Sequence, residues 1–371
     1  MNHPSGDKQN MDTLSRVMIR KHCSNHPESL PEDWEILNQD LRYVGEMSSS
    51  QRGALLKLAS DNHVLVRALT RIKNGAVLVG SPTIADWCDD AMRTECERIE
   101  AAVDNLHSIC EILEANNCSV AVIKSLDHWP DLGSDLDLYT TADPGHIAQV
   151  MHQHFNASPV ERSWGDRLAN KWNYSVPGLR ELVEIHVQFL GQTGEHSQLA
   201  RRVIARRVRK TVGGYDFYVP APEERIVIST LQRVYRHFYF RLCDMVDASL
   251  LIQNEGLDFV ELRRSADASG IWPGVSTFLH LIKKYIESYG GQLLLPKEVL
   301  ESAHHRGKRV EFHKDFLRVS KLTAASLYAA QLADASRHRD TRAMLRLPLL
   351  PPLAVSALVA YRLTGDDKGI W

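Results

Sequence analysis

The spacing of apolar residues changes abruptly near residue 118, and this change constrains the fold more than any other feature of the sequence. Over residues 11–117 the apolar side chains recur with the period of an α-helix. Residues 118–123 instead form a short β-branched run, and further strand patterns follow at residues 136–139 and 182–189. We therefore expect an all-helical unit followed by a mixed sheet.

Turn and capping residues divide the rest of the chain. Pro144, preceded by an aspartate, is typical of a helix start and predicts a helix over residues 144–155. A Gly-Gly pair within residues 208–219 predicts a hairpin, and residues 220–224 open a helix expected to reach about residue 253. The fold class is α+β, with a disordered lead-in at 1–10, a helical unit at 11–117, a mixed-sheet core at 118–220 and a helical C-terminal domain at 221–371.

The composition is that of an ordinary globular protein. Hydrophobic residues make up 44% of the 371 residues, and the formal net charge of −2 gives no overall field that would attract a nucleic acid. The six cysteines form no C-x-x-C pair, which favours a reducing, cytoplasmic location. The most apolar stretch, residues 345–361, is interrupted by an arginine and three prolines, so we expect a packed helix there and no membrane contact.

Two carboxylates on one predicted strand are the first candidates for chemistry. Strand alternation places Asp135 and Asp137 on one face and Leu136 and Leu138 on the other. Two adjacent negative charges are costly unless a hard divalent cation, Mg²⁺ or Mn²⁺, binds beside them. A solvent-exposed acidic turn is the alternative interpretation. We expect a metal site at Asp135 and Asp137.

A second strand pattern supplies a candidate third carboxylate. Glu184, His186 and Gln188 share one face of residues 182–189, and apolar residues share the other. Three carboxylates on neighbouring strands suit two-metal phosphoryl transfer, in which Glu184 is a metal ligand or a base. His186 is a candidate for orienting that carboxylate or contacting substrate, and a hydrogen-bonded structural histidine is the alternative.

These residues resemble the signature of the nucleotidyltransferase superfamily, in which a small turn precedes an Asp-x-Asp strand by about ten residues. Here the turn is Ile123-Lys124-Ser125 and the strand carries Asp135-Leu136-Asp137. More narrowly, the chain resembles an uncharacterised bacterial nucleotidyltransferase-like branch with a Lys-Gly turn, a Glu-x-His strand and helical flanks.

The resemblance implies a nucleotidyltransferase-type core in which Asp135, Asp137 and Glu184 are catalytic metal ligands. It also implies a set of residues that contact the nucleotide. These are Lys124, Ser125, Ser134, His186, His237 and Arg241.

The sequence departs from the branch at two places. Ser125 stands where the turn usually has glycine, so its hydroxyl would donate in place of a closely approaching backbone. Residues 131–134 lack the arginine that often precedes the Asp pair. This second departure would leave the triphosphate charge to the metal and Lys124.

Two basic regions have competing interpretations. In the long helix expected after residue 222, Arg233, His237, Arg241 and Asp244 would form one polar stripe. We interpret Arg233 as a solvated, salt-bridged residue, whereas the resemblance favours functional roles for His237, Arg241 and Asp247. Residues 201–210 carry six basic residues in ten positions; a solvated face is expected, with contact to an anionic ligand as the alternative.

The predicted function is Mg-dependent transfer of a nucleoside monophosphate from a nucleoside triphosphate, ATP by expectation, to a hydroxyl or similar acceptor, with release of pyrophosphate. One alternative is a catalytically silent member that binds a nucleotide or a protein partner in the same pocket. Another is a toxin or defence nucleotidyltransferase that modifies RNA or protein. The near-neutral charge weighs against nucleic acid without excluding it.

Overall fold

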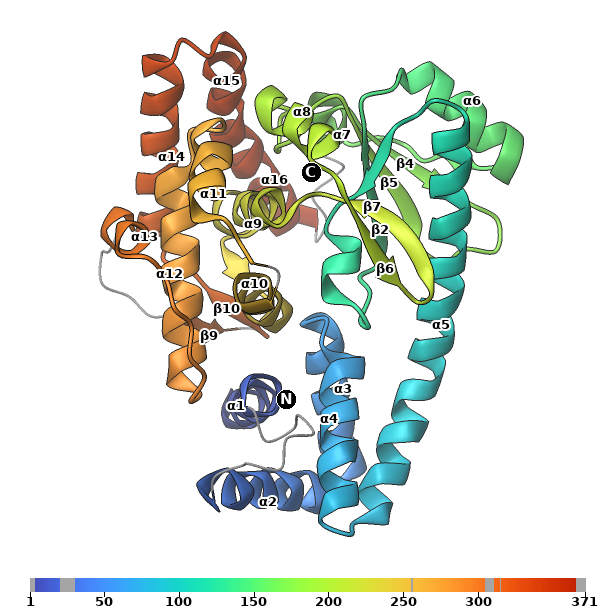
Figure 1. Ribbon diagram of the computed structural model, residues 1–371, viewed down its shortest axis with the longest axis vertical. Helices are drawn as coiled ribbons and strands as arrows, with labels where there is room; N and C mark the ends of the chain where they lie inside the picture. Colours follow the sequence, from blue (N-terminus) through green and yellow to red (C-terminus); the bar gives the residue numbers. More distant parts are fainter. Residues whose placement is uncertain (1–3, 21–30, 255, 304–309, 314, 365–371) are drawn as a thin grey trace.

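The computed structural model describes residues 4–20, 31–254, 256–303, 310–313 and 315–364. It is an α+β protein in which helical segments precede and follow a mixed sheet along the chain, as the spacing of apolar residues predicted. In Figure 1 the N-terminal helices (blue) lie below the sheet and the C-terminal helices (orange to red) lie beside it.

The N-terminal unit is helical throughout its described residues. Its helices are α1 (Pro4–Ile19), α2 (Pro31–Glu46), α3 (Ser49–Asp61), α4 (Leu65–Leu78) and α5 (Pro82–Ala115). Helix α1 begins at Pro4, so the disordered lead-in expected over residues 1–10 is wrong from residue 4 onwards, and residues 1–3 lie outside the described part. The apolar residues Met11, Leu14 and Val17 explain the difference, since each is at most 2% exposed and seats α1 against α3 and α4.

The core contains the mixed sheet and a separate hairpin. Its elements are β1 (Val120–Val122), the 3₁₀ helix η2 (Ser125–His128), β2 (Asp135–Thr140), α6 (Pro144–Phe155), β3 (Ser158–Pro159), α7 (Trp164–Ala169), β4 (Lys171–Ser175), β5 (Leu182–Val187), α8 (Ser197–Ala205), β6 (Val208–Val212) and β7 (Tyr215–Val219). The strand order is β1-β2-β5-β4-β3, in which β2 and β5 are parallel and the other neighbours are antiparallel. The predicted hairpin is present as β6 and β7, and α6 begins at Pro144 with Asp143 accepting a hydrogen bond from the His146 N–H.

The two faces of the sheet differ in polarity because side chains alternate along each strand. Leu136, Leu138, Val183 and Ile185 are fully buried on one face. The long helix α5 packs against β1, β7 and α6, and so connects the N-terminal helices to the sheet (Figure 1). The opposite face of β2 and β5 carries polar side chains and remains partly open.

The C-terminal unit is mostly helical, as predicted, but it also contains a three-stranded antiparallel sheet that was not predicted. It contains α9 (Pro222–Thr230), the π-helix η3 (Leu231–His237), β8 (Tyr239–Phe240), α10 (Leu242–Asn254), α11 (Phe259–Asp267), α12 (Trp272–Ser288), α13 (Lys297–Ser302), β9 (Glu311–His313), β10 (Phe316–Arg318), α14 (Lys321–Arg337), α15 (Thr341–Arg346), the 3₁₀ helix η4 (Leu347–Leu349) and α16 (Leu350–Thr364).

The single helix expected from residue 222 to about 253 is wrong, because the chain breaks at Phe238. That residue has the left-handed conformation with φ +58°, and the next two residues pair with β10. Phe240 is fully buried and stacks on Phe278 at 5.4 Å between ring centroids. Long-range pairing and aromatic packing therefore override the helical period of this segment.

The apolar stretch at residues 345–361 spans the end of α15, η4 and most of α16. Leu347 is fully buried, but Val355 and Val359 are 60% and 49% exposed, so the expectation of a packed helix holds at Leu347 and fails at these positions of α16. No helix among the described residues is long and apolar enough to cross a membrane.

Candidate functional site

The parallel pairing of β2 with β5 sets three carboxylates on one wall of a cleft. Asp137 lies directly opposite Glu184 in the strand register, and Asp135 is two residues earlier on the same face. All three line an open cleft of about 700 Å³. The alternation read from the sequence therefore placed these side chains on the correct face.

The turn that follows β1 brings a lysine to the same carboxylates. Lys124 has φ +65° and ψ −57°, and the Ser125 N–H donates to the Ile123 carbonyl at 2.7 Å, which together define a γ-turn centred on Lys124. A positive φ is strained for a residue with a Cβ and is common at binding sites. In this turn the Lys124 ammonium forms an ion pair with Asp137 and lies 3.8 Å from Glu184.

Ser125 fastens this turn to β2. Its buried hydroxyl donates to the Asp135 carbonyl at 3.2 Å and accepts the Asp137 N–H at 2.8 Å. The serine that replaces glycine thus bridges the two backbone positions that carry the Asp pair. The hydroxyl was expected to contact phosphate, and in this structure both of its hydrogen bonds are made to the protein backbone.

Glu184 is held in a buried network of charges. Its carboxylate accepts a hydrogen bond from His186 Nε2 at 2.8 Å and pairs with Lys171 Nζ at 2.9 Å, while the same ammonium pairs with Asp166 at 2.7 Å. Burial alone would raise the pKa of Glu184, but the hydrogen bond from His186 and the charges of Lys124 and Lys171 hold it well below its ordinary value. Glu184 is therefore ionised at neutral pH.

Asp135 has the opposite electrostatic setting. Burial, together with the neighbouring charges of Asp137 and Glu184, raises the pKa of Asp135. A cation beside this carboxylate would relieve that repulsion.

The donor atoms fit a divalent cation. Among the described residues, Asp137, Glu184 and His186 each offer a ligand atom, and these atoms lie within 4.8 Å of one another. Asp135 lines the same cleft wall without belonging to this tight group. The carboxylate oxygens are the ligands that Mg²⁺ or Mn²⁺ prefers, and the imidazole nitrogen is a softer donor beside them.

Several cations face the carboxylates across the cleft. Its lining includes Arg233, Arg236 and Arg241 as well as His237. Residues of η3, together with Arg241 just before α10, therefore add positively charged side chains to the one that Lys124 supplies. Burial, with the charges of Arg236 and Arg233, lowers the pKa of His237 to about 2, so this histidine is neutral at physiological pH.

Arg233 is not the solvated residue predicted from the helical stripe. Its side chain is 1% exposed, and its Nε lies 2.8 Å from Asp244 Oδ2. The same oxygen accepts the Arg241 N–H at 2.7 Å. Because the chain turns back at Phe238, the ion pair joins η3 to α10, and the polar stripe of one continuous helix does not form.

The remaining predicted residues differ in exposure and in their distance from the cleft. Ser134 is exposed and its hydroxyl donates to Asp135 at 3.3 Å. Asp247 is buried behind the cleft, where it pairs with His128 and Arg67. The basic run at residues 201–210 is not simply solvated, since three of its arginines pair with carboxylates of other elements. The pairs are Arg202 with Glu224 and Glu261, Arg206 with Glu223 and Glu224, and Arg207 with Glu114.

Sequence patterns did not identify several residues of the site. His63 and His128 line the cleft, and Lys171 pairs with Glu184. His63 comes from the α3–α4 corner, far from the sheet in sequence, and carries no local signal. Lys171 lies on β4, a short strand that was not predicted. The alternation of polar and aromatic residues over residues 171–175 would have been a usable strand signal.

Comparison with known proteins places the chain in a family. It belongs to the family described as uncharacterised nucleotidyltransferase, whose model matches residues 48–287. No curated protein shows significant similarity. A crystal structure of an antigenic nucleotidyltransferase-like protein from Paracoccidioides brasiliensis is similar over 56% of this chain and 98% of its own, with 13% sequence identity and a TM-score of 0.34.

Proposed function

We propose that this protein transfers a nucleoside monophosphate from a nucleoside triphosphate, ATP in the first instance, to a hydroxyl or similar acceptor and releases pyrophosphate. One observation carries the proposal: a single cleft holds Asp135, Asp137 and Glu184 on one wall, and it is also lined by the arginines of η3 and by Arg241 just before α10. Carboxylates of this kind bind a hard divalent cation, whereas lysine and arginine bind phosphate oxygens. The cleft therefore offers carboxylate ligands for the metal and cationic side chains for the triphosphate.

Asp135, Asp137 and Glu184 are the proposed ligands of Mg²⁺ or Mn²⁺. The cation, when bound, would neutralise triphosphate charge and polarise the reacting phosphate. Lys124 would contact phosphate from the γ-turn, with Arg241 and neutral His237 on the facing wall. His186 would keep Glu184 oriented through its 2.8 Å hydrogen bond. The buried Lys171 would fix the other oxygen of that carboxylate.

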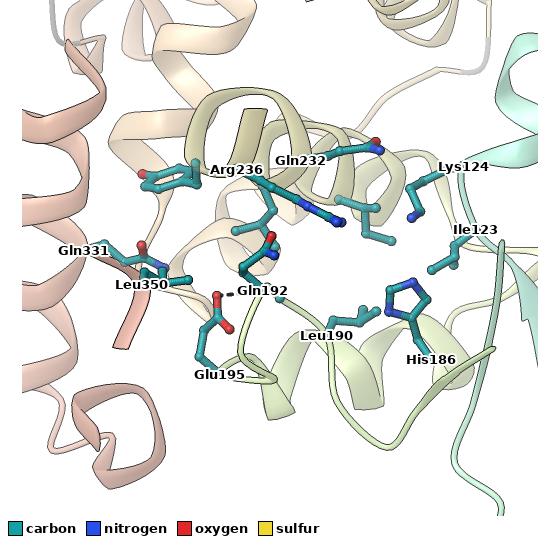
Figure 2. Close-up of a pocket in the computed structure, with 14 residues that line it drawn as sticks. Ile123, Lys124, His186, Leu190, Gln192, Glu195, Gln232, Arg236, Gln331 and Leu350 are labelled. Carbon is teal, nitrogen blue, oxygen red and sulfur yellow. Dashed lines mark hydrogen bonds between the residues drawn. The ribbon is translucent and has the colours of Figure 1, made fainter. Parts of the chain in front are cut away.

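A second cavity is the proposed acceptor site. The space among its lining side chains, including the part open to solvent, is about 600 Å³, and it shares Lys124, Gln232 and Arg236 with the cleft. Figure 2 shows Lys124 and His186 at one side of this cavity and Gln331 at the other. Its amide groups and Glu195 offer donors and acceptors for a hydroxylated molecule. Because the two cavities share three residues, an acceptor bound here would lie next to the triphosphate.

A second candidate function is nucleotide binding without turnover. The position of Lys124 favours this candidate, because its ammonium pairs with Asp137 and approaches Glu184. These are two of the carboxylates that an active member would use to bind the metal. A silent member would bind nucleotide through the arginines and Lys124 while these carboxylates stay ion-paired. The two candidates predict the same binding site and differ in product formation.

Mass spectrometry of candidate acceptors tests the proposal. The full chain is incubated with each nucleoside triphosphate, Mg²⁺ and a panel of hydroxylated small molecules, RNAs and proteins. We expect one acceptor to gain the mass of a nucleoside monophosphate less one water, and the D135N/D137N double variant to abolish the gain. Asp216→Asn is the matched control, since Asp216 is an exposed carboxylate of the β6–β7 hairpin. Nucleotide binding with no mass gain on any acceptor would instead support the silent member.

A further inference from the structure

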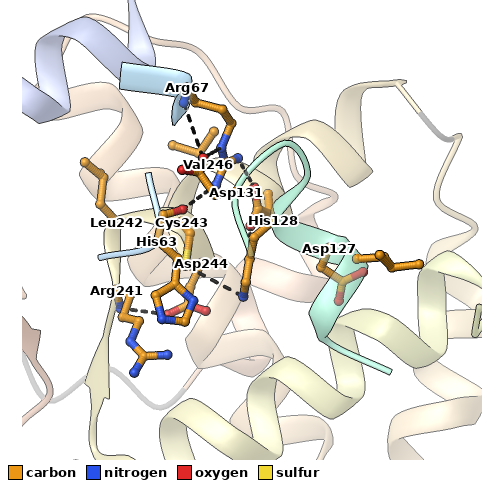
Figure 3. Close-up of polar contacts among 12 residues, drawn as sticks. His63, Arg67, Asp127, His128, Asp131, Arg241, Leu242, Cys243, Asp244 and Val246 are labelled. Carbon is orange, nitrogen blue, oxygen red and sulfur yellow. Dashed lines mark hydrogen bonds and ion pairs between the residues drawn. The ribbon is translucent and has the colours of Figure 1, made fainter. Parts of the chain in front are cut away.

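A second group of metal-ligating side chains shares the cleft with the carboxylate site but none of its residues. Among the described residues, His63, His128 and Cys243 each offer one ligand atom, and these atoms lie within 4.8 Å of one another. Figure 3 shows the three side chains together beside Asp244 and Arg241. Two imidazoles and a thiol are softer donors than the carboxylates of the neighbouring site and suit a different class of metal.

The backbone holds the three residues together through specific contacts. Asn62 accepts the Leu242 N–H on its side chain at 2.9 Å and the Cys243 N–H on its carbonyl at 3.2 Å. These two bonds fix the α3–α4 corner to the start of α10, which places His63 beside Cys243. His128 is the last residue of η2. One ligand thus comes from each of the three parts of the chain.

Asp247 gives His128 the tautomer that a metal requires. His128 Nδ1 lies 2.5 Å from Asp247 Oδ2, and Arg67 also pairs with this carboxylate. An ionised carboxylate only accepts hydrogen bonds, so Nδ1 carries a proton and Nε2 is the nitrogen left to face a metal, which would displace any proton there on binding. That Nε2 lies 3.9 Å from Cys243 Sγ. A carboxylate behind the distal nitrogen of a histidine is the usual support of a metal-binding imidazole.

The remaining geometry also fits a metal. Zinc bonds of about 2.0 Å to nitrogen and about 2.3 Å to sulfur place tetrahedral N and S ligands about 3.5 Å apart, close to the 3.9 Å between His128 Nε2 and Cys243 Sγ. His63 Nδ1 is buried and has no hydrogen-bond partner among the described residues. Ligation through Nδ1 would satisfy this nitrogen. A buried imidazole nitrogen without a partner is otherwise costly.

We propose that His63, His128 and Cys243 bind a thiophilic divalent cation of the zinc class, with the fourth coordination position open to the cleft. His63 and His128 both line that cleft, so water or an oxygen of a bound ligand can reach the open position. This site is separate from the proposed carboxylate site for Mg²⁺, and it does not depend on nucleotidyl transfer.

The same three side chains also resemble a nucleophilic cysteine with its histidine and aspartate. Burial argues against that role, because Cys243 is fully buried and a substrate carbon or phosphorus could not reach its sulfur. A nucleophilic role would also leave His63 without a partner. Metal ligation uses all three groups and needs only an ion to enter.

Cobalt(II) binding to the metal-free full chain tests the proposal, because Co²⁺ replaces Zn²⁺ and a Co–thiolate bond adds a charge-transfer absorption band. We expect one equivalent of Co²⁺ to produce this band and one equivalent of Zn²⁺ to displace it. Cys243→Ser should abolish the band. Asp247→Asn should weaken Co²⁺ binding by about 10- to 100-fold, the usual range for loss of such a support. Cys96→Ser, a half-buried cysteine of α5, is the matched control and should leave the band unchanged.

Two further variants keep the result interpretable. His63→Gln replaces a partly exposed side chain, so it tests ligation even if Cys243→Ser fails to fold, and it should weaken Co²⁺ binding at least tenfold. The D135N/D137N variant should retain the band, which separates this site from the carboxylate site. A folded wild-type chain without the band, or a band that survives in Cys243→Ser, would overturn the proposal. So would rapid alkylation of Cys243 that Zn²⁺ does not slow.

Discussion

The buried ion pair between Arg233 and Asp244 makes the strongest stability prediction, and Asp244→Asn is the perturbation that tests it. Both side chains are at most 4% exposed, and 2.8 Å separates Arg233 Nε from Asp244 Oδ2. At an effective dielectric constant of about 20, two unit charges at this distance attract by about 6 kcal/mol. Burial of both charges opposes this attraction, but asparagine removes the attraction and leaves the guanidinium buried.

Breaking one side of such a pair typically costs about 3–5 kcal/mol, and we expect Asp244→Asn to lower the free energy of unfolding by this amount. Chemical denaturation followed by circular dichroism measures the change, with coincident probes used to establish a single transition. Asp267→Asn is the matched control, because its pair with Arg263 is about half exposed and should matter by less than about 1 kcal/mol. Equal effects of the two variants would refute the assignment of Arg233 as a buried charge that Asp244 compensates.

Three further predictions concern the cleft and its support. The pKa of His237 is about 2 in the folded chain against about 6.5 unfolded, so the unfolded state takes up a proton first and stability falls as the pH drops below about 6.5. Between pH 7.5 and pH 5 the wild-type chain should therefore lose about 2 kcal/mol more unfolding free energy than His237→Asn, as measured by denaturation at both pH values. Equal losses in the wild type and the variant would contradict this. Ser125→Ala should cost about 1–3 kcal/mol and weaken binding of Mg·ATP in calorimetry, because the Asp137 N–H loses its acceptor; unchanged values would count against the bridge. Gly274→Ala should destabilise the fold by about 1–3 kcal/mol in thermal unfolding, since the new Cβ would lie 2.3 Å from the Tyr235 hydroxyl oxygen. Gly53→Ala is the control, because its Cβ has open space in α3 and should stabilise the helix slightly. A Gly274→Ala variant more stable than Gly53→Ala would be incompatible with this packing.

The carboxylate wall could be predicted because its determinants are local. Alternation along one strand puts Asp135 and Asp137 on the same face, and the same period holds for Glu184 and His186. The structure adds only that β2 and β5 are parallel neighbours in a register that pairs Asp137 with Glu184. The α+β class and the hairpin follow from similarly local patterns of apolar residues and glycine.

The facing wall could not be predicted, because it depends on contacts between distant segments. The break at Phe238 arises from pairing with β10, about eighty residues later, and from stacking on Phe278. Helical periodicity contains neither contact, so Arg233 was assigned to a solvent-facing stripe. His63 likewise reaches the cleft only because Asn62 binds the start of α10. Residue spacing within one element cannot report such a contact.

Release of pyrophosphate from ATP in the presence of Mg²⁺ and an acceptor tests the central claim most directly. The rate is measured for the wild-type chain, for Asp135→Asn and Asp137→Asn, and for the exposed control Asp216→Asn, with chelator added to parallel samples. We predict that wild type and Asp216→Asn release pyrophosphate at similar rates, that chelator stops both, and that each of the other two variants is at least 100-fold slower. Metal-independent release, or release unaffected by both Asp135→Asn and Asp137→Asn, would contradict the assignment of this cleft as a nucleotidyltransferase active site.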